Sequence, residues 1–159
     1  MTDTSDLLDL LLSSGGPDDV AVQDDQASVT YAGLTERVND LSALIERTVP
    51  AAGPLVIDLP RSVDLVIALL AALRAGRTTV PVEPGWQSSW ANAAVARLGA
   101  THALVIGGDR RDSVAIVALP GRPQGVRNSG AVYILHTSGS TGVPKAVAMG
   151  TAPLRALTS

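Results

Sequence analysis

The residues best suited to chemistry lie between Tyr133 and Val147, in the run YILHTSGSTGVPKAV. Glycines allow positive φ and a close approach to a ligand, and consecutive N–H groups in such a turn can surround an anion. Hydroxyl groups add hydrogen-bond donors, and a lysine adds a mobile positive charge. This combination predicts a polyphosphate-binding loop made of Thr137, Ser138, Gly139, Ser140, Thr141, Gly142 and Lys145.

Better-known catalytic loops do not fit this stretch. A P-loop needs Gly-Lys followed directly by Ser or Thr before a helix, whereas Lys145 follows Pro144 and leads into the apolar residues 146–148. The dinucleotide motif G-x-G-x-x-G and the nucleophile elbow G-x-S-x-G are also missing. The order is therefore strand, glycine-rich loop, lysine, strand. A Gly/Ser hairpin without a ligand is the alternative interpretation.

The same run closely resembles the phosphate-loop signature of AMP-forming adenylating enzymes, which include nonribosomal peptide synthetase adenylation domains, acyl-CoA synthetases and luciferases. Residues 29–34, VTYAGL, resemble the family's early LTYxEL motif. Residues 73–83, LRAGRTTVPVE, resemble LKAGxAYVPxD, and residues 59–62 match an LPRS segment. The motifs follow the family's order and cover nearly the whole chain. The resemblance is nearest to the peptide synthetase branch.

The resemblance implies a two-step reaction that uses ATP and Mg²⁺. A carboxylate attacks the α-phosphate to give an acyl-adenylate and pyrophosphate, and a thiol then takes the acyl group. The loop would hold the β- and γ-phosphates, and Lys145 would offset leaving-group charge. The family's adenine, ribose, magnesium and acid sites and its catalytic lysine follow the position of Ser159. No catalytic or metal residue is therefore assigned, and residues 1–159 are expected to be a partial adenylation (AMP-binding) domain that ends just after the phosphate loop.

Several residues beside the loop depart from the family pattern. Ala146 replaces a glycine, Thr151 replaces a histidine, and Pro153 interrupts a helix. We therefore expect a truncated or fragmentary ATP-dependent carboxylic or amino acid adenylating ligase, from nonribosomal peptide or related secondary metabolism, that is inactive alone. The alternative is a non-catalytic adenylation-domain remnant that serves as a partner-binding or structural module.

The expected partners follow from the same comparison. ATP and pyrophosphate should bind weakly. The strands around residues 132–135 and 147–149 should expose apolar side chains at a sheet edge, and such edges pair with other chains. We therefore expect self-association, or a companion polypeptide that completes the domain.

Alternation of predicted strands and helices indicates an α/β fold, a mainly parallel sheet with flanking helices. The family resemblance implies the front part of the large N-terminal domain of adenylating enzymes. Asp6, Thr30 and Ser62 are the predicted N-caps. Gly33 stands where the family has a glutamate that would form a capping box with Thr30. Helices are predicted over residues 6–13, 30–47, 63–75 and 88–98. Strands are predicted over residues 20–22, 28–30, 55–59, 78–82, 102–106, 113–119, 131–135 and 145–149.

Composition argues against several other classes. The formal net charge is −3 and no basic block occurs, so nucleic acid and anionic membranes are not expected partners. The chain has no cysteine, which excludes disulfides, thiolate metal sites and cysteine nucleophiles. His102 and His136 lack companions at ligand spacing and are expected to be structural strand residues. The longest apolar run, 65–73, is too short to span a bilayer, and the acidic N-terminus does not resemble a secretory signal. We expect a cytoplasmic protein.

Overall fold

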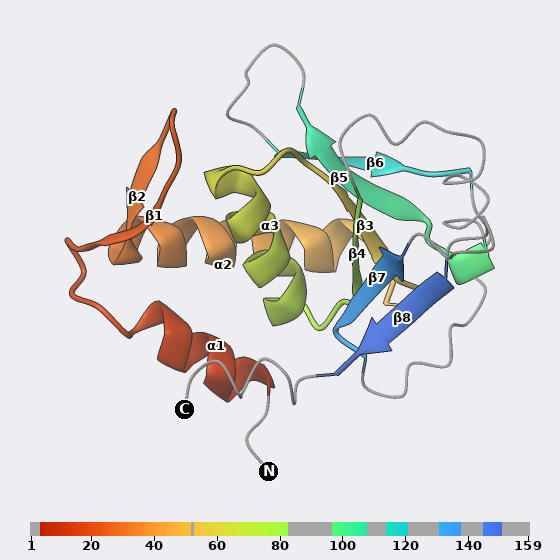
Figure 1. The fold of residues 1–159 in the computed structure, drawn as a ribbon, viewed down its shortest axis with the longest axis horizontal. Coiled ribbons are helices and arrows are strands. Elements are labelled where there is room, and N and C mark those ends of the chain that lie inside the picture. Colours follow the sequence, from red (N-terminus) through yellow and green to blue (C-terminus); the bar gives the residue numbers. More distant parts are fainter. Residues whose placement is uncertain are drawn as a thin grey trace.

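The computed structural model describes residues 4–51, 53–82, 97–107, 114–120, 131–137 and 145–150. Six of the strands in these ranges form one sheet, and two more form a separate hairpin (Figure 1). The elements in chain order are α1 (Thr4–Leu12), β1 (Val20–Gln23), β2 (Ser28–Thr30), α2 (Tyr31–Thr48), β3 (Leu55–Asp58), α3 (Val63–Arg74), β4 (Thr79–Pro81), β5 (His102–Ile106), β6 (Val114–Ala118), β7 (Tyr133–Thr137) and β8 (Lys145–Met149).

The large sheet is parallel in its centre and antiparallel at both sides. Its strand order is β6-β5-β3-β4-β7-β8. β5, β3, β4 and β7 run parallel to one another, whereas β6 pairs antiparallel with β5 and β8 pairs antiparallel with β7. This arrangement confirms the mainly parallel α/β sheet. It also places the carboxyl ends of β3, β4, β5 and β7 at one edge.

Local sequence signals start and stop the two longer helices. Thr30 caps α2 by accepting a hydrogen bond from the Gly33 N–H, and Ser62 caps α3 by accepting one from the Leu65 N–H. These bonds satisfy N–H groups that the first helical turn leaves free. α3 ends before Gly76, whose φ of 67° is left-handed and favours a residue without a Cβ. The N-caps predicted at Thr30 and Ser62 are confirmed.

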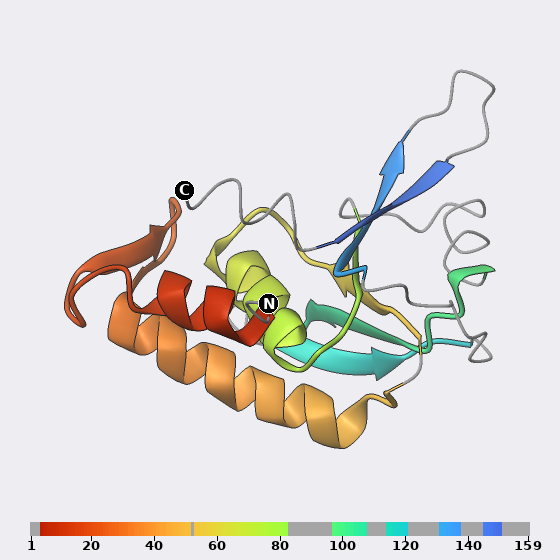
Figure 2. The same cartoon turned by 90° about the horizontal axis from the view of Figure 1, so that it is seen from below.

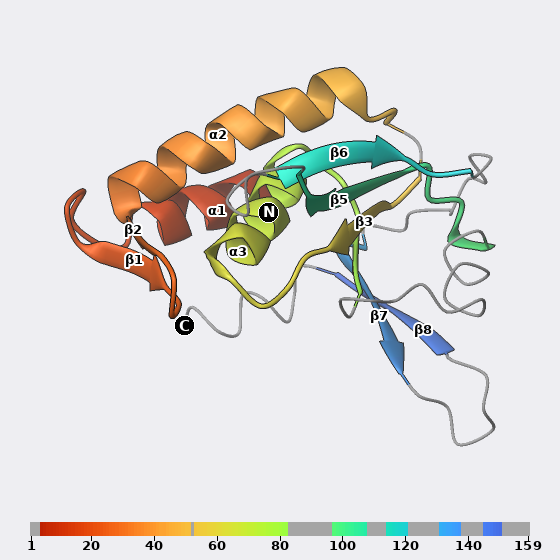
Figure 3. The same ribbon diagram turned by 90° about the horizontal axis from the view of Figure 1, so that it is seen from above.

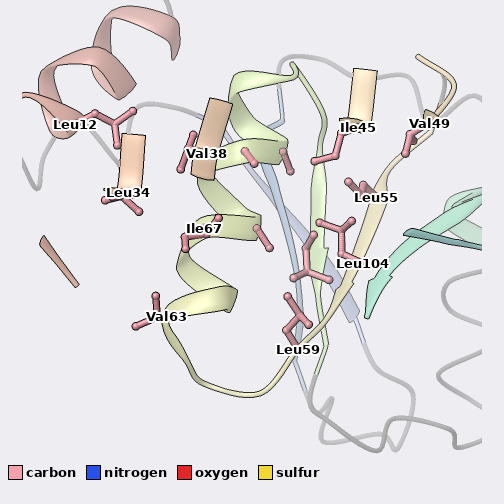
Figure 4. Close-up of a cluster of buried hydrophobic side chains, with 14 residues drawn as sticks. Leu12, Leu34, Val38, Ile45, Val49, Leu55, Leu59, Val63, Ile67 and Leu104 are labelled. Atoms are coloured by element: carbon pink, nitrogen blue, oxygen red, sulfur yellow. The ribbon is translucent and has the colours of Figure 1, made fainter. Parts of the chain in front are cut away.

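α2 and α3 lie against one face of the sheet and α1 packs on these two helices, as Figures 2 and 3 show from opposite sides. Alternate residues of β3 point to opposite faces, so Leu55 and Ile57 pack toward the helices while Val56 faces the other way. The helical face holds the larger core (Figure 4). Its buried members include Leu12, Leu34, Val38, Ile45, Leu55, Ile57, Val63, Ile67 and Leu104.

The opposite face carries a smaller cluster of Val56, Val80, Ala100, Ala103 and Ile134. These residues come from four strands and from the segment that leads into β5. Their side chains are mostly small, and they tie β7 to the centre of the sheet through Ile134. The two sides of the sheet therefore differ in how much apolar volume they bury.

A few predicted boundaries were wrong. α1 begins at Thr4, so Asp6 lies in its first turn and not at the cap. The strand predicted over residues 131–135 is β7, which spans Tyr133–Thr137 and so starts and ends two residues later. Most of the helix predicted over residues 88–98 lies outside the described residues.

Candidate functional site

The candidate site begins at the root of the β7–β8 hairpin, where hydroxyl groups hold the incoming chain. The Thr78 hydroxyl donates to the Ala131 carbonyl at 2.7 Å, and the Thr79 hydroxyl donates to the Val132 carbonyl at 3.1 Å. The Thr79 N–H donates to the same Val132 carbonyl at 2.9 Å. Thr79 is fully buried. The start of β7 is therefore fixed against β4 by side-chain and backbone bonds together.

The hairpin itself has a regular antiparallel register. Tyr133 pairs with Met149, Leu135 with Val147, and Thr137 with Lys145. Directly opposed residues in such a ladder have Cα atoms about 5 Å apart. The backbones of Thr137 and Lys145 thus stand together at the end of the hairpin, with residues 138–144 connecting them. The strands predicted before and after the glycine-rich stretch are both confirmed, as β7 and β8.

Only the two ends of the predicted phosphate loop belong to the described structure. Thr137 ends β7 and Lys145 begins β8, and their backbones face each other. Ser138, Gly139, Ser140, Thr141 and Gly142 lie outside the described residues, and so do the side chains of Thr137 and Lys145. The seven site residues therefore stay a prediction, supported at its two ends by the position of the backbone.

The sheet topology places the end of β7, and so the start of this stretch, at the carboxyl edge of the sheet. β7 is parallel to β4, and β4 is parallel to β3, so the loop leaves from the carboxyl edge shared by these strands. Ligands in open α/β sheets bind outside that edge. Paired strand ends with a short glycine-rich connection can direct several N–H groups at one anion. The arrangement is suited to holding phosphate.

Two titratable groups near these strands have shifted pKa values. Burial raises the pKa of the Tyr133 phenol above its ordinary value of 10.0, which keeps the ring neutral at the root of the hairpin. Burial also raises the pKa of Asp58, the last residue of β3, above its ordinary value of 3.8. Asp58 has no hydrogen-bond or ion-pair partner among the described residues. Its carboxylate lies at the same edge of the sheet, two strands from β7.

Metal ligands do not gather in the described parts of the chain. No group of three His, Asp or Glu side chains there could hold an ion. His102 lies on β5, where its Nδ1 is 3.0 Å from the Thr101 hydroxyl, and His136 lies on β7. Both histidines are strand residues, as predicted. Across the described residues, every helix is too short or too polar to cross a membrane.

Sequence reasoning missed the two threonines that anchor the hairpin. Thr78 and Thr79 were interpreted only as part of a strand, because residues 131 and 132 are 53 positions away in sequence. The sequence feature that could have indicated these contacts is the pair of adjacent threonines at the start of a short strand. Such residues favour strands for several reasons, so the pattern alone does not identify their partners.

Comparison with known proteins places this geometry in a family. Residues 13–159 match the family model for AMP-binding enzymes. The dapdiamide synthesis protein DdaD of Enterobacter agglomerans is 31% identical over 130 residues, which cover 80% of this chain and 22% of DdaD. The probable non-canonical nonribosomal peptide synthetase CymA of Salinispora arenicola is 34% identical over 142 residues, which cover 89% of this chain and 2% of CymA. The chain spans less than a quarter of either relative.

Solved structures give the same result. The N-terminal subdomain of Klebsiella oxytoca NpsA, in complex with 3-hydroxyanthranilyl-AMSN, superposes with a TM-score of 0.69 at 25% identity. The match covers 94% of this chain and 41% of that one. VinN in complex with L-aspartate superposes with a TM-score of 0.69 at 22% identity, covering 93% of this chain and 48% of VinN, and supports the fold alone. The match to the family model extends over almost the whole sequence, and the chain belongs to the AMP-binding enzyme family.

Proposed function

We propose that this chain contributes the ATP phosphate-binding loop of a cytoplasmic ligase that adenylates a carboxylic or amino acid in nonribosomal peptide or related metabolism. The observation that carries the proposal is the β7–β8 hairpin, whose register brings Thr137 and Lys145 together around a Ser/Thr/Gly loop. The fold supports it because β7, which leads into this stretch, ends at the carboxyl edge of a mainly parallel sheet. Bound ATP would supply the electrophilic phosphate, and this loop would hold its β- and γ-phosphates.

The sequence offers a direct probe of this loop. Lys145 is the only lysine in the chain. Reductive methylation with ¹³C-formaldehyde therefore labels one side chain besides the N-terminal amine, and its NMR signal reports on the loop alone. Pyrophosphate, ATP and GTP should each shift the Lys145 signal with weak and similar affinities, because a backbone anion site has no selectivity for the base.

A matched pair of variants separates loop binding from general charge attraction. Lys145→Ala should weaken binding of all three ligands in calorimetry, whereas Arg47→Ala, on the exposed end of α2, should not. Equal losses in the two variants would argue against a phosphate loop. Tight binding that prefers ATP over GTP would show that a complete nucleotide site exists in the chain and would contradict the weak, unselective binding proposed here.

We further propose that the 159-residue chain does not form acyl-adenylates alone. Catalysis of this kind depends on positioning both reactants, and this chain spans 22% of DdaD. Mg²⁺ is implied by the family, but the described residues offer no metal cluster, so no step is assigned to it. ATP–pyrophosphate exchange with amino acids and aryl acids is the test, and robust exchange by the purified chain would overturn the proposal.

The alternative function is a non-catalytic module that binds a partner, and one surface supports it. Leu135 and Val147 are directly opposed on the hairpin and are 39% and 47% exposed. No described strand pairs with the outer edge of β8. An apolar pair beside an open edge favours association with another chain. We propose either self-association or a companion polypeptide that completes the sheet.

Light scattering after size-exclusion chromatography tests this surface. Leu135→Ser should reduce association, whereas Leu44→Ser should not, although Leu44 on α2 has a nearly equal exposure of 38%. A monomer at all concentrations, alone and with any co-encoded protein, would exclude the association. If the chain associated with a co-encoded protein and the complex catalysed ATP–pyrophosphate exchange, the result would instead support a two-chain enzyme over the non-catalytic module.

A further inference from the structure

A second crevice lies on the helical side of the molecule, separate from the β7–β8 loop. It has a volume of about 430 Å³. Four parts of the chain form its walls: the β1–β2 turn, the start of α2, the β3–α3 turn and the end of β5. The lining residues are Asp24, Asp25, Gln26, Ala27, Arg37, Leu59, Pro60, Arg61, Ser62, Val63, Asp64 and Ile106.

The position of the crevice in the sheet is informative. β3 connects through α3 to β4 on one side, whereas β5 pairs with the other side of β3. The chain thus leaves the carboxyl ends of β3 and β5 in opposite directions. Such a switch point opens a crevice at which open α/β sheets bind ligands. The volume is also in the range of small-molecule sites, about 300–1,000 Å³.

Hydrogen bonds hold the walls in place without a ligand. The Asp24 carboxylate accepts from the Val63 N–H at 2.7 Å, which joins the hairpin turn to the first turn of α3. It also accepts from the N–H groups of Gln26 and Ala27 at 2.7 and 2.8 Å. Arg37 of α2 forms an ion pair with Asp64 of α3. The crevice is therefore preformed, and a ligand would not have to order its walls.

These bonds leave two opposite charges available in the crevice. Arg61 and Asp25 are exposed, and neither has a hydrogen-bond or ion-pair partner among the described residues. The charges of Asp24 and Asp64 are already matched by N–H groups and by Arg37. The remaining free groups are one guanidinium and one carboxylate, and Ile106 adds an apolar side chain that is 49% exposed.

We propose that this crevice binds a small zwitterion with an apolar body, of the class of the aliphatic α-amino acids. The Arg61 guanidinium receives the ligand's carboxylate, since its planar fork suits bidentate binding. The Asp25 carboxylate receives the ammonium group, and Ile106 contacts the aliphatic side chain. A ligand that carries only one of the two charges leaves the other protein group without a partner.

Leucine is the probe, with 4-methylpentanoate and 3-methylbutylamine as ligands that lack its ammonium or its carboxylate. Calorimetry on the whole 159-residue chain should show saturable leucine binding and binding about tenfold weaker for each single-charge analogue, as expected for loss of a charge-assisted hydrogen bond. Arg61→Gln and Asp25→Asn should each weaken leucine binding about tenfold for the same reason.

Controls of the same chemical type lie outside the crevice. Arg47→Gln and Asp18→Asn each remove an exposed charge outside the crevice and should leave the affinity for leucine unchanged. Circular dichroism should show the wild-type spectrum for all four variants. Equal binding of leucine and 4-methylpentanoate, or leucine binding that neither crevice variant weakens, would overturn the proposal. Absence of leucine binding up to its solubility limit would also overturn it. None of these outcomes depends on phosphate binding at the hairpin loop.

Discussion

The helical side of the sheet and the β7–β8 hairpin are stabilised in different ways. On the helical side, α1, α2, α3, β3 and β5 all contribute buried side chains to one large apolar cluster. The hairpin has one backbone register pair with β4, Thr79 with Tyr133, and among its described side chains only Ile134 is buried. Figure 2 shows β7 and β8 extending away from the helices. The hairpin thus depends on a few hydrogen bonds at its root.

This difference separates stability from binding. The helical side buries enough apolar surface to set the stability of the whole domain. The hairpin buries little, and regions with few buried contacts open locally at low free energy. The polyphosphate site and the pairing edge proposed above both belong to this less buried region. The two regions should therefore respond differently to the same kind of substitution.

The largest expected effect comes from truncating the helical core. Leu104 on β5 is 0% exposed, so Leu104→Ala should lower the free energy of unfolding by about 2–5 kcal/mol through lost burial and a cavity. Leu135→Ala on the hairpin removes the same atoms from an exposed position and should change the free energy of unfolding by less than about 0.5 kcal/mol. Urea titration of both variants is the measurement. Similar losses would mean that the hairpin belongs to the same cooperative unit.

The same contrast explains how far sequence reasoning could go. Thr30, Ser62 and Gly76 act within a few residues of their own helix ends, so local pattern identified them. The apolar runs of β3 and β5 likewise identified buried strands. The loop was assigned from residue type and resemblance, and that assignment describes its chemistry without fixing where its side chains point.

A middle-sized effect should follow from loosening the root of the hairpin. Thr79→Val keeps the shape of the side chain and removes the hydroxyl that donates to the Val132 carbonyl. The loss should be about 1 kcal/mol, the typical net value of one hydrogen bond. Amide exchange should accelerate mainly in β7 and β8, with little change in α2 and α3. Uniform acceleration across the domain would contradict a locally anchored hairpin.

Sequence alone did not reveal the contacts that join distant segments. Asp24 lies between the two short strands predicted over residues 20–22 and 28–30, and its carboxylate accepts a hydrogen bond from the N–H of Val63, 39 residues later. Thr79 and Val132 are likewise far apart in the chain. Neither pairing leaves a periodic pattern, because each depends on where the sheet brings two turns together. Those contacts shape both the crevice and the hairpin root, and local pattern could predict neither of them.

A smaller, stabilising effect is expected on the helical side. Gly33 lies in the first turn of α2, and a Cβ there would meet Val29 and Thr30 only at ordinary contact distances of 3.4 and 3.6 Å. Gly33→Ala should therefore raise the free energy of unfolding by about 0.5–1 kcal/mol through helix propensity. Gly76→Ala is the control and should destabilise, because its φ of 67° strains any residue with a Cβ. A destabilised Gly33→Ala would reveal crowding at the start of α2.

The smallest effect should be a pH dependence of opposite sign at two aspartates, one on each side of the sheet. The hydrogen bond from the Val63 N–H, followed by those from Gln26 and Ala27, lowers the pKa of Asp24. Its stabilisation is present above the ordinary carboxyl pKa and is lost as pH falls through the lowered value. Burial raises the pKa of Asp58. Its ionised form therefore destabilises the fold at neutral pH, and that penalty disappears as pH falls through the raised value.

Two asparagine variants separate these contributions. Asp58→Asn should be more stable than the wild type near pH 7, by a small margin because the carboxylate is partly exposed, and the difference should vanish toward about pH 4. Asp24→Asn should be less stable than the wild type near pH 7, since an amide accepts the three N–H groups less well than a carboxylate. Urea midpoints across this pH range measure both. If Asp58→Asn were less stable at neutral pH, its carboxylate would be making a favourable contact with part of the chain beyond the described residues. Asp58, at the carboxyl edge of the sheet, would then be stabilised in its ionised form, as Asp24 is on the helical side.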